Sequence, residues 1–149
     1  MLRGSGIKWD LRKNQPYSVY PEIDFDVCTS SRCDNLGRFQ VRVDEMYQSA
    51  RIVEQAHNAL KDMPGEFRAE LPRVIKPAAG EVYCAMESAK GEQGVYLISD
   101  GTDKAYRVHF REPSFINLTI LDYLARGFLI ADLVASLGSI DIVLGGVDR

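Results

Sequence analysis

Cysteine and histidine are scarce in this chain, and their placement excludes the commonest metal sites. The 149 residues include three cysteines and two histidines. Cys28, Cys33 and Cys84 have no paired CxxC spacing, which a zinc site or an iron–sulfur cluster would need. Neither His57 nor His109 has a cysteine or carboxylate at metal-ligand spacing. We therefore expect no metal or cofactor bound by the chain, and free thiols in a reducing compartment.

An excess of positive charge and an uninterrupted apolar span are also missing. The net charge of -3 argues against a nucleic-acid binder, because phosphate neutralisation needs concentrated Lys and Arg. The longest apolar stretch, residues 127–147, is broken by Asp132 and Asp141 and makes a poor transmembrane segment. No Gly-rich loop joins a predicted strand to a helix, so we expect NADH to bind elsewhere.

The amino-terminal half contains one long periodic segment. Hydrophobic residues make up 46% of the chain and charged residues 26%, the balance of one globular domain. Residues 1–37 are rich in proline and polar residues and predict an extended arm with one short strand at 23–27. Residues 38–63 predict a long amphipathic helix ended by Pro64–Gly65. Its stripe, which must pack on this chain or on a helical bundle outside it, is Phe39, Val43, Met46, Ala50, Val53, His57 and Leu60.

In the carboxyl-terminal half, alternating apolar and polar residues are followed by segments with a helical pattern. Residues 64–80 carry three prolines and two glycines and predict a connecting loop. Within 81–149, three alternating runs separated by turn residues predict a three-stranded antiparallel meander. Two helices follow, one from Pro113 to Gly127 and one over 129–137 that Gly138 ends, and then a short strand-like tail. This order of elements predicts an α+β fold.

Two segments carry charges that packing alone does not explain. The tail places Asp141 between two isoleucines, where an ionised carboxylate is costly to bury unless it is paired or faces a polar cavity. The tail is therefore predicted to be the wall of a site. The turn at residues 87–92 holds Lys90 between two carboxylates. This arrangement is typical either of a lysine that projects from the turn with its charge partly compensated or of a charged hairpin tip with no further role. His109 with Arg107 and Arg111 favours a solvated or partner-facing strand surface, and His57 favours a packed position on the helix stripe.

Four segments together carry a family resemblance. They are the (R)GSGxxWDLR segment at residues 3–12, the turn at 87–92, the Arg-Glu-Pro-Ser-Phe corner at 111–115 and the thiol-free tail. The chain resembles, nearly end to end, the carboxyl-terminal part of the D subunit of the respiratory NADH:quinone oxidoreductase, complex I. That family is related to nickel-iron hydrogenase large subunits, which hold a metal-binding cysteine pair where this chain has residues 141–143. Ala89 replaces the usual proline of the turn, and Gly146 replaces the usual glutamate of the tail.

The resemblance implies a role in quinone reduction. It makes Asp141 a buried carboxylate of the quinone pocket, Val143 an apolar contact, Arg149 a terminal cation and Lys90 a loop cation, with Arg111 in support. The chain would be part of the peripheral-arm catalytic subunit of a proton-pumping enzyme, inactive in isolation and with no catalytic group of its own. An iron–sulfur cluster on a neighbouring subunit would supply electrons, and quinone would be the substrate.

The same resemblance implies partners and a location. The partners would be the cluster-bearing subunit, the membrane arm and the missing amino-terminal part, with no nucleic acid. The chain would lie on the cytoplasmic side of the bacterial inner membrane, peripheral and without a transmembrane segment. Two alternatives stay open: a structural or assembly module that docks on other subunits, and the large subunit of a membrane-bound hydrogenase, against which the absent cysteine pair argues.

Overall fold

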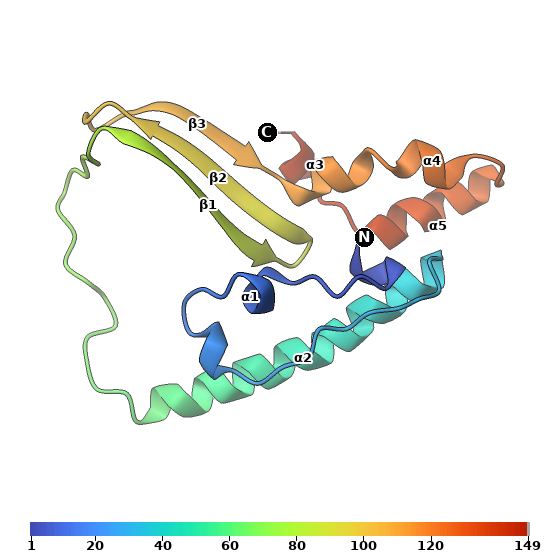
Figure 1. Ribbon diagram of the computed structural model, residues 1–149, viewed down its shortest axis with the longest axis horizontal. Helices are drawn as coiled ribbons and strands as arrows, with labels where there is room; N and C mark the ends of the chain where they lie inside the picture. Colours follow the sequence, from blue (N-terminus) through green and yellow to red (C-terminus); the bar gives the residue numbers. More distant parts are fainter. Residues whose placement is uncertain (149) are drawn as a thin grey trace.

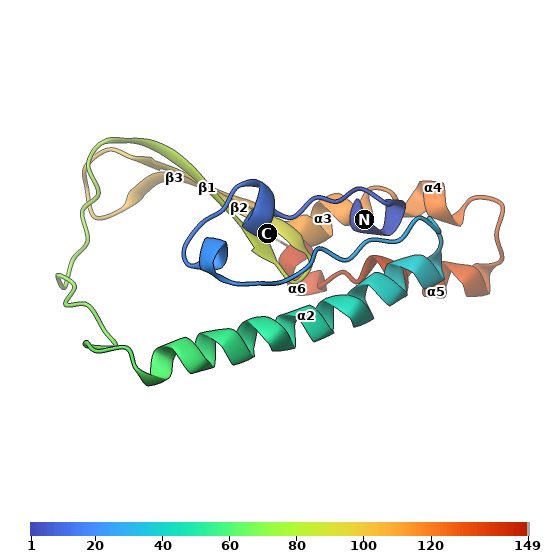
Figure 2. The ribbon, with the colours of Figure 1, turned by 60° about the horizontal axis from the view of Figure 1, so that its bottom comes forward.

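A computed structural model describes residues 1–148 as a long helix, a three-stranded sheet and a group of short carboxyl-terminal helices (Figure 1). Arg149 lies outside the described residues. The amino-terminal arm lies between the sheet and the long helix α2 (Figure 1), and α5 (Ile130–Ile140) lies beside the first turns of α2 (Figure 2). This confirms the α+β class predicted from the sequence.

Helix α2 (Asn35–Lys61) begins earlier than the hydrophobic periodicity predicted. Asp34 is in an extended conformation and its carboxylate accepts a hydrogen bond of 2.6 Å from the Gly37 amide, the geometry of a helix N-cap. Gly37 then lies in the first turn, where a Cβ would come within 2.8 Å of Ser30 Oγ. The arm therefore ends at Asp34, because the cap and not the first large apolar residue sets the start of the helix.

The predicted stripe of α2 does not pack on the described chain. Its large members are more than half exposed: Phe39 58%, Met46 63%, Val53 66% and Leu60 65%. His57 is exposed too, so residues 1–148 do not supply its predicted packing, which stays a prediction with the rest of the stripe. The face turned to the rest of the chain instead carries buried Arg38 and Val41 and the polar side chains of Arg42, Glu45, Gln48 and Gln55. Packing of the stripe on a helical bundle outside the chain stays a prediction.

The arm contains helical turns and no strand. Its elements are η1 (Arg3–Ser5), α1 (Leu11–Asn14) and η2 (Tyr20–Glu22). Residues 23–27, predicted as a strand, run along α2 without pairing to another strand, so that prediction is wrong (Figure 1). Two glutamine side chains of α2 satisfy their backbone instead: Gln55 accepts from the Asp24 amide and Gln48 from the Asp26 amide. Side-chain partners on a helix remove the need for a neighbouring strand.

The predicted meander is confirmed. Strands β1 (Gly80–Ser88), β2 (Gly91–Ser99) and β3 (Ala105–Arg111) pair antiparallel in that order, with Tyr83 opposite Tyr96 and Tyr96 opposite His109. Residues 62–79 connect α2 to β1. The β1–β2 connection is only two residues long, Ala89–Lys90, and Ser88 pairs directly with Gly91. A tight hairpin of this kind holds its tip in a defined position.

The carboxyl-terminal helices differ from prediction at their ends. The first predicted helix is divided into α3 (Pro113–Leu118) and α4 (Leu121–Ala125), and α5 (Ile130–Ile140) continues through Gly138 instead of ending there. Asp141 ends α5 with a left-handed backbone, φ 58°. The tail then forms the short helix α6 (Leu144–Val147), so the predicted strand-like tail is wrong. The reversed backbone at Asp141 redirects the chain into a turn beside α3.

Candidate functional site

The tip of the β1–β2 hairpin meets the end of α5 at a three-charge cluster. Lys90 Nζ lies 2.6 Å from Asp141 Oδ2, and Arg42 Nε lies 3.2 Å from the same oxygen. The structure therefore brings together Lys90 and Asp141, which the sequence had singled out separately. The Asp141 side chain is 35% exposed, so its predicted description as a buried carboxylate is wrong. Two cations pair with the Asp141 carboxylate, which stays in partial contact with solvent.

Two arginines of α2 hold Asp141 in place by binding the last turn of α5. Arg38 Nε donates to Ser139 Oγ over 2.8 Å, and Arg42 donates to the backbone carbonyl of Ser139. The Asp141 amide closes the helix by donating to the carbonyls of Leu137 and Gly138. Guanidinium groups at a helix carboxyl end are stabilised by the helix dipole and satisfy carbonyls that would otherwise lack donors. Burial lowers the pKa of both arginines, against the raising effect of Asp141 on Arg42.

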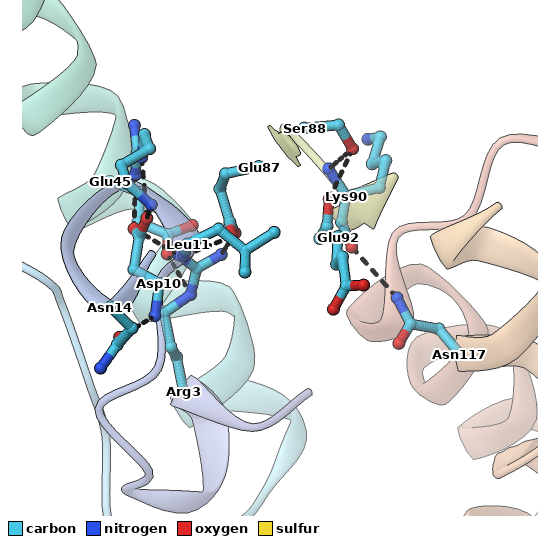
Figure 3. Close-up of polar contacts among 12 residues, drawn as sticks. Arg3, Asp10, Leu11, Asn14, Glu45, Glu87, Ser88, Lys90, Glu92 and Asn117 are labelled. Atoms are coloured by element: carbon cyan, nitrogen blue, oxygen red, sulfur yellow. Dashed lines mark hydrogen bonds and ion pairs between the residues drawn. The ribbon is translucent and has the colours of Figure 1, made fainter. Parts of the chain in front are cut away.

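Lys90 lies in a turn that is stabilised by hydrogen bonds from two side chains, those of Ser88 and Asn117. Ser88 Oγ donates to the Gly91 carbonyl over 2.8 Å and accepts from the Lys90 amide, and Asn117 of α3 donates to the Lys90 carbonyl over 3.2 Å (Figure 3). Gly91 has φ 130°, which favours glycine. These contacts hold the tip although Ala89 occupies the position where the family usually has proline.

A second cluster, centred on Arg3, lies close to the turn of the hairpin, at Glu87 (Figure 3). The Arg3 guanidinium lies 3.0 Å from Asp10 Oδ2, 2.8 Å from Glu45 Oε1 and 2.9 Å from Glu87 Oε1. Asp10 is fully buried and also binds Arg12. Burial raises the pKa of Asp10, but the hydrogen bonds and charge of Arg12 and the charge of Arg3 outweigh it, and the net pKa is lowered.

Glu87 connects this Arg3 cluster to the hairpin. Its carboxylate accepts from the Leu11 amide over 3.1 Å, and its own amide donates to the Tyr17 hydroxyl over 3.0 Å. The sequence pointed to the (R)GSGxxWDLR segment and to the turn, but not to their contact. Glu45 and Arg42 were missed because they stand among other charges on a helix. Their spacing of three residues was the one signal that placed them on a common face.

Two cavities flank the hairpin tip. One, of about 390 Å³, is lined by Lys90, Glu92 and Arg111 together with apolar residues, among them Leu2, Trp9, Ile116 and Ile120. The other, of about 380 Å³, is lined by charged residues, among them Arg42, Glu45, Glu87 and Asp141. The tip thus separates an apolar-walled cavity from a charged one, with Lys90 facing the first and bound to Asp141 of the second.

The remaining predicted site residues lie around this centre. Arg111 donates to the Glu92 carbonyl and lines the apolar-walled cavity, which agrees with a supporting position. Val143 is 48% exposed, and its amide donates to the Oγ of fully buried Ser114 over 3.2 Å. Arg107 and His109 are exposed on β3, the surface position expected for them. Arg149 lies outside the described residues, and no contact is assigned to it.

A metal ion bound by this chain would need a group of ligating side chains held close together. Among residues 1–148, no set of three His, Cys, Asp or Glu side chains is grouped as a metal site requires. In the same range, no helix combines the length and apolar character needed to cross a bilayer.

The fold is that of a subunit from a respiratory membrane complex. The described chain superposes with a TM-score of 0.90 and 36% sequence identity on a chain in the structure of the membrane-bound sulfane sulfur reductase, an archaeal respiratory membrane complex. The match covers 99% of this chain and 41% of the other.

Sequence comparison identifies the family. Residues 1–77 and 67–149 match the model of the respiratory-chain NADH dehydrogenase 49 kDa subunit. The chain is 51% identical over 148 residues to the NADH-quinone oxidoreductase D subunit of Desulforamulus reducens, and 50% identical over 150 residues to the D subunit of Dehalococcoides mccartyi. These matches cover at least 99% of this chain, which spans 40% of the length of each relative. The chain therefore belongs to the 49 kDa, or D-subunit, family of respiratory NADH dehydrogenase, which confirms the resemblance found in the sequence.

Proposed function

We propose that this chain is the carboxyl-terminal part of the catalytic subunit of an NADH:quinone oxidoreductase and forms one wall of the quinone-reduction pocket. The observation that carries the proposal is the contact of Asp141 with both Lys90 and Arg42 beside a mostly apolar cavity of about 390 Å³. A quinone headgroup and the start of its tail need such a cavity, with few polar groups that orient them. The family membership supports the same assignment.

The chemistry of this wall is electrostatic. Quinone reduction adds two electrons and two protons and passes through negative charge on the headgroup oxygens. Lys90 and Arg111 line the cavity and are placed to stabilise that charge, and Asp141 holds the Lys90 ammonium in position. The electrons come from an iron–sulfur cluster on a neighbouring subunit, and NADH is oxidised on another subunit. This chain binds no cofactor in the proposal.

The proposal includes the setting of the chain. Its partners are the cluster-bearing subunit, the membrane arm and the remaining part of the D subunit, which completes the pocket. The complex lies peripherally on the cytoplasmic side of the bacterial inner membrane. Because the chain supplies only one wall, the isolated polypeptide is inactive.

The test is Asp141→Asn in the assembled complex. We expect quinone reductase turnover to fall, because Lys90 loses its charged partner, while NADH oxidation by an artificial acceptor is unchanged. The control is Asp122→Asn, an exposed carboxylate on α4 paired only with Arg126. Wild-type quinone turnover in Asp141→Asn would remove this cluster from the pocket. Reduction of sulfane sulfur by a wild-type complex that does not reduce quinone would instead support the acceptor of the structurally similar sulfane sulfur reductase.

A second candidate is a structural or assembly role. The exposed stripe of α2 favours it, since exposed apolar residues in a row along a helix are typical of an interface. Val53→Asp tests this alternative: loss of the chain from the purified complex supports assembly, and normal incorporation contradicts it. Quinone turnover per assembled complex separates the two roles.

A further inference from the structure

One half-buried carboxyl group, that of Glu45, has no function in the pocket described above. It lies on the inner face of α2, one turn from Arg42, and its side chain is 23% exposed. Its Oε1 atom is shielded from solvent, and within residues 1–148 no donor is oriented to make a hydrogen bond to it. Arg3 Nε lies 2.8 Å away, close enough for an ion pair but not aligned for a hydrogen bond. A shielded carboxyl oxygen without a donor favours the protonated state.

The charges around Glu45 come from every element packed against it. Arg3 and the amino terminus at Met1 approach from the arm, Asp10 and Arg12 from α1, Glu87 from β1 and Arg42 from its own helix. Around Arg3, three carboxylates (Asp10, Glu45 and Glu87) share two guanidinium groups, those of Arg3 and Arg12. Burial, together with Glu87 and Asp10, raises the pKa of Glu45 against the lowering effects of Arg3 and Arg12.

Glu45 lies beside the proposed pocket, in the neighbouring charged cavity. It lines this cavity of about 380 Å³ together with Asp141 and Arg42, and a smaller cavity of about 40 Å³ together with Lys90 and Asp141. Asp10 is fully buried and Glu87 accepts a hydrogen bond from a backbone amide. Glu45 is therefore the member of the Arg3 cluster that combines an unbonded carboxyl oxygen with access to this cavity.

We propose that the Glu45 carboxyl holds a proton before reduction and supplies it to the quinone reduced beside the Lys90–Asp141 contact. This inference rests on the proposed function. In the step, the O–H bond of Glu45 breaks and its proton passes through water to form one O–H bond of the quinol. The two electrons come from the iron–sulfur cluster of the neighbouring subunit, and the second proton comes from another source. The carboxylate left behind is stabilised by Arg3 and Arg42 and takes up a proton from water.

The first experiment does not depend on quinone. Infrared difference spectra of the assembled complex, recorded during a pH titration without quinone, are expected to show a protonated carboxyl band that Glu45→Gln removes. Glu54→Gln, an exposed carboxylate on the same helix, is the matched control and leaves the band unchanged. If Glu45→Gln removes no titrating carboxyl band, the inference is overturned whatever the pocket binds.

The second experiment measures the pH profile of quinone reduction. Glu45 is protonated below its raised pKa, so the wild-type rate falls as the pH rises through that pKa. In Glu45→Gln we expect a rate roughly a hundredfold lower below the pKa and flat across the same range, since water replaces a positioned proton donor poorly. The wild-type and variant rates converge at alkaline pH. A wild-type profile in Glu45→Gln overturns the inference.

Two further variants separate the possible failures. Glu45→Asp keeps a carboxyl group and is expected to restore the pH dependence at a reduced rate, which keeps the test valid if Glu45→Gln assembles poorly. If Asp141→Asn lowers quinone turnover while both Glu45 variants keep the wild-type profile, the proposed function stands and only the inference fails. If Asp141→Asn has wild-type turnover, the proposed function fails, and the infrared band alone decides whether Glu45 holds a proton.

Discussion

Asp141 Oδ2 lies 2.6 Å from Lys90 Nζ and 3.2 Å from Arg42 Nε, so one carboxylate joins the tip of a hairpin to two helices. The three side chains are between a quarter and about a third exposed. Ion pairs of this exposure are screened by solvent and contribute little to stability. We infer that the main effect of the contact is to position the Lys90 cation beside the mostly apolar cavity.

The first prediction separates these two effects of Lys90. Lys90→Met is expected to lower the free energy of unfolding by less than about 1 kcal/mol, because the pair is partly exposed. Quinone turnover is expected to fall by about a hundredfold, the typical cost of losing one group that stabilises developing negative charge. Lys90→Arg retains most of the activity. A variant that unfolds readily but turns over normally would assign Lys90 a structural role.

The second prediction concerns the buried carboxylate of Asp10. Asp10→Asn is expected to lower the free energy of unfolding by about 3 kcal/mol, because it leaves the guanidinium groups of Arg3 and Arg12 without their buried partner. Denaturant unfolding at neutral pH measures the loss. Asp103→Asn, an exposed residue in the β2–β3 loop, is the control and stays close to the wild type.

The same residue predicts an acid limit of stability. The pKa of Asp10 is lowered in the folded state, so its stabilisation is fully present above the unfolded pKa of about 3.9 and is lost as the pH falls through the lower, folded pKa. The wild type is therefore expected to lose stability more steeply than Asp10→Asn below about pH 4. Parallel curves for the two proteins would contradict the assigned pKa direction.

The fourth prediction is that replacing glycine by alanine has opposite effects on stability at Gly94 and at Gly138. A Cβ on Gly94 in β2 would come within 2.3 Å of the Tyr83 hydroxyl and 2.7 Å of its ring, so Gly94→Ala is expected to cost about 1–3 kcal/mol by displacing that ring. A Cβ on Gly138 in α5 would meet nothing within 4 Å, and Gly138→Ala is expected to stabilise by about 0.5–1 kcal/mol. Thermal unfolding of both variants measures the contrast. Equal shifts would contradict it.

The last prediction concerns the position of Val143. Fully buried Ser114 accepts the Val143 amide through its Oγ, and this bond fixes the tail beside α3. Ser114→Ala leaves that amide without its partner and is expected to cost about 1–2 kcal/mol. Hydrogen exchange at the Val143 amide is expected to quicken, while exchange in the β1–β2 hairpin does not change. Unchanged exchange at Val143 would show that another contact holds the tail.

Local chemistry made much of the fold predictable. Alternating residues and turn residues specified the meander, because strand pairing across a two-residue connection depends on neighbours in the chain. Pro64–Gly65 correctly indicated where α2 stops. The start of α2 is also set by a local feature, the Asp34 N-cap, but the hydrophobic periodicity predicted a start three residues later.

Distant partners decided the elements that were predicted wrongly. Residues 23–27 alternate like a strand, yet Gln48 and Gln55 of α2 bind their backbone in place of another strand. Gly138 is a residue that commonly ends helices, yet Arg38 and Arg42 hold the turn that contains Ser139 and keep α5 helical to Ile140. Tertiary contacts override the intrinsic helix or strand propensity of a segment where side chains from another element satisfy its backbone hydrogen bonds.

For the site, the sequence by itself determined the individual charges. The turn at 87–92 presents Lys90, and the apolar tail requires a partner for Asp141, because an ionised group among isoleucines is costly to leave unpaired. Only the tertiary structure decided what those partners are. Arg42 and Glu45 stand among many charges on α2, and they reach Asp141 and Arg3 because the long helix lies across the end of α5 and near the turn of the hairpin. Ion pairs between distant segments leave no local pattern, so packing alone selects which charges meet.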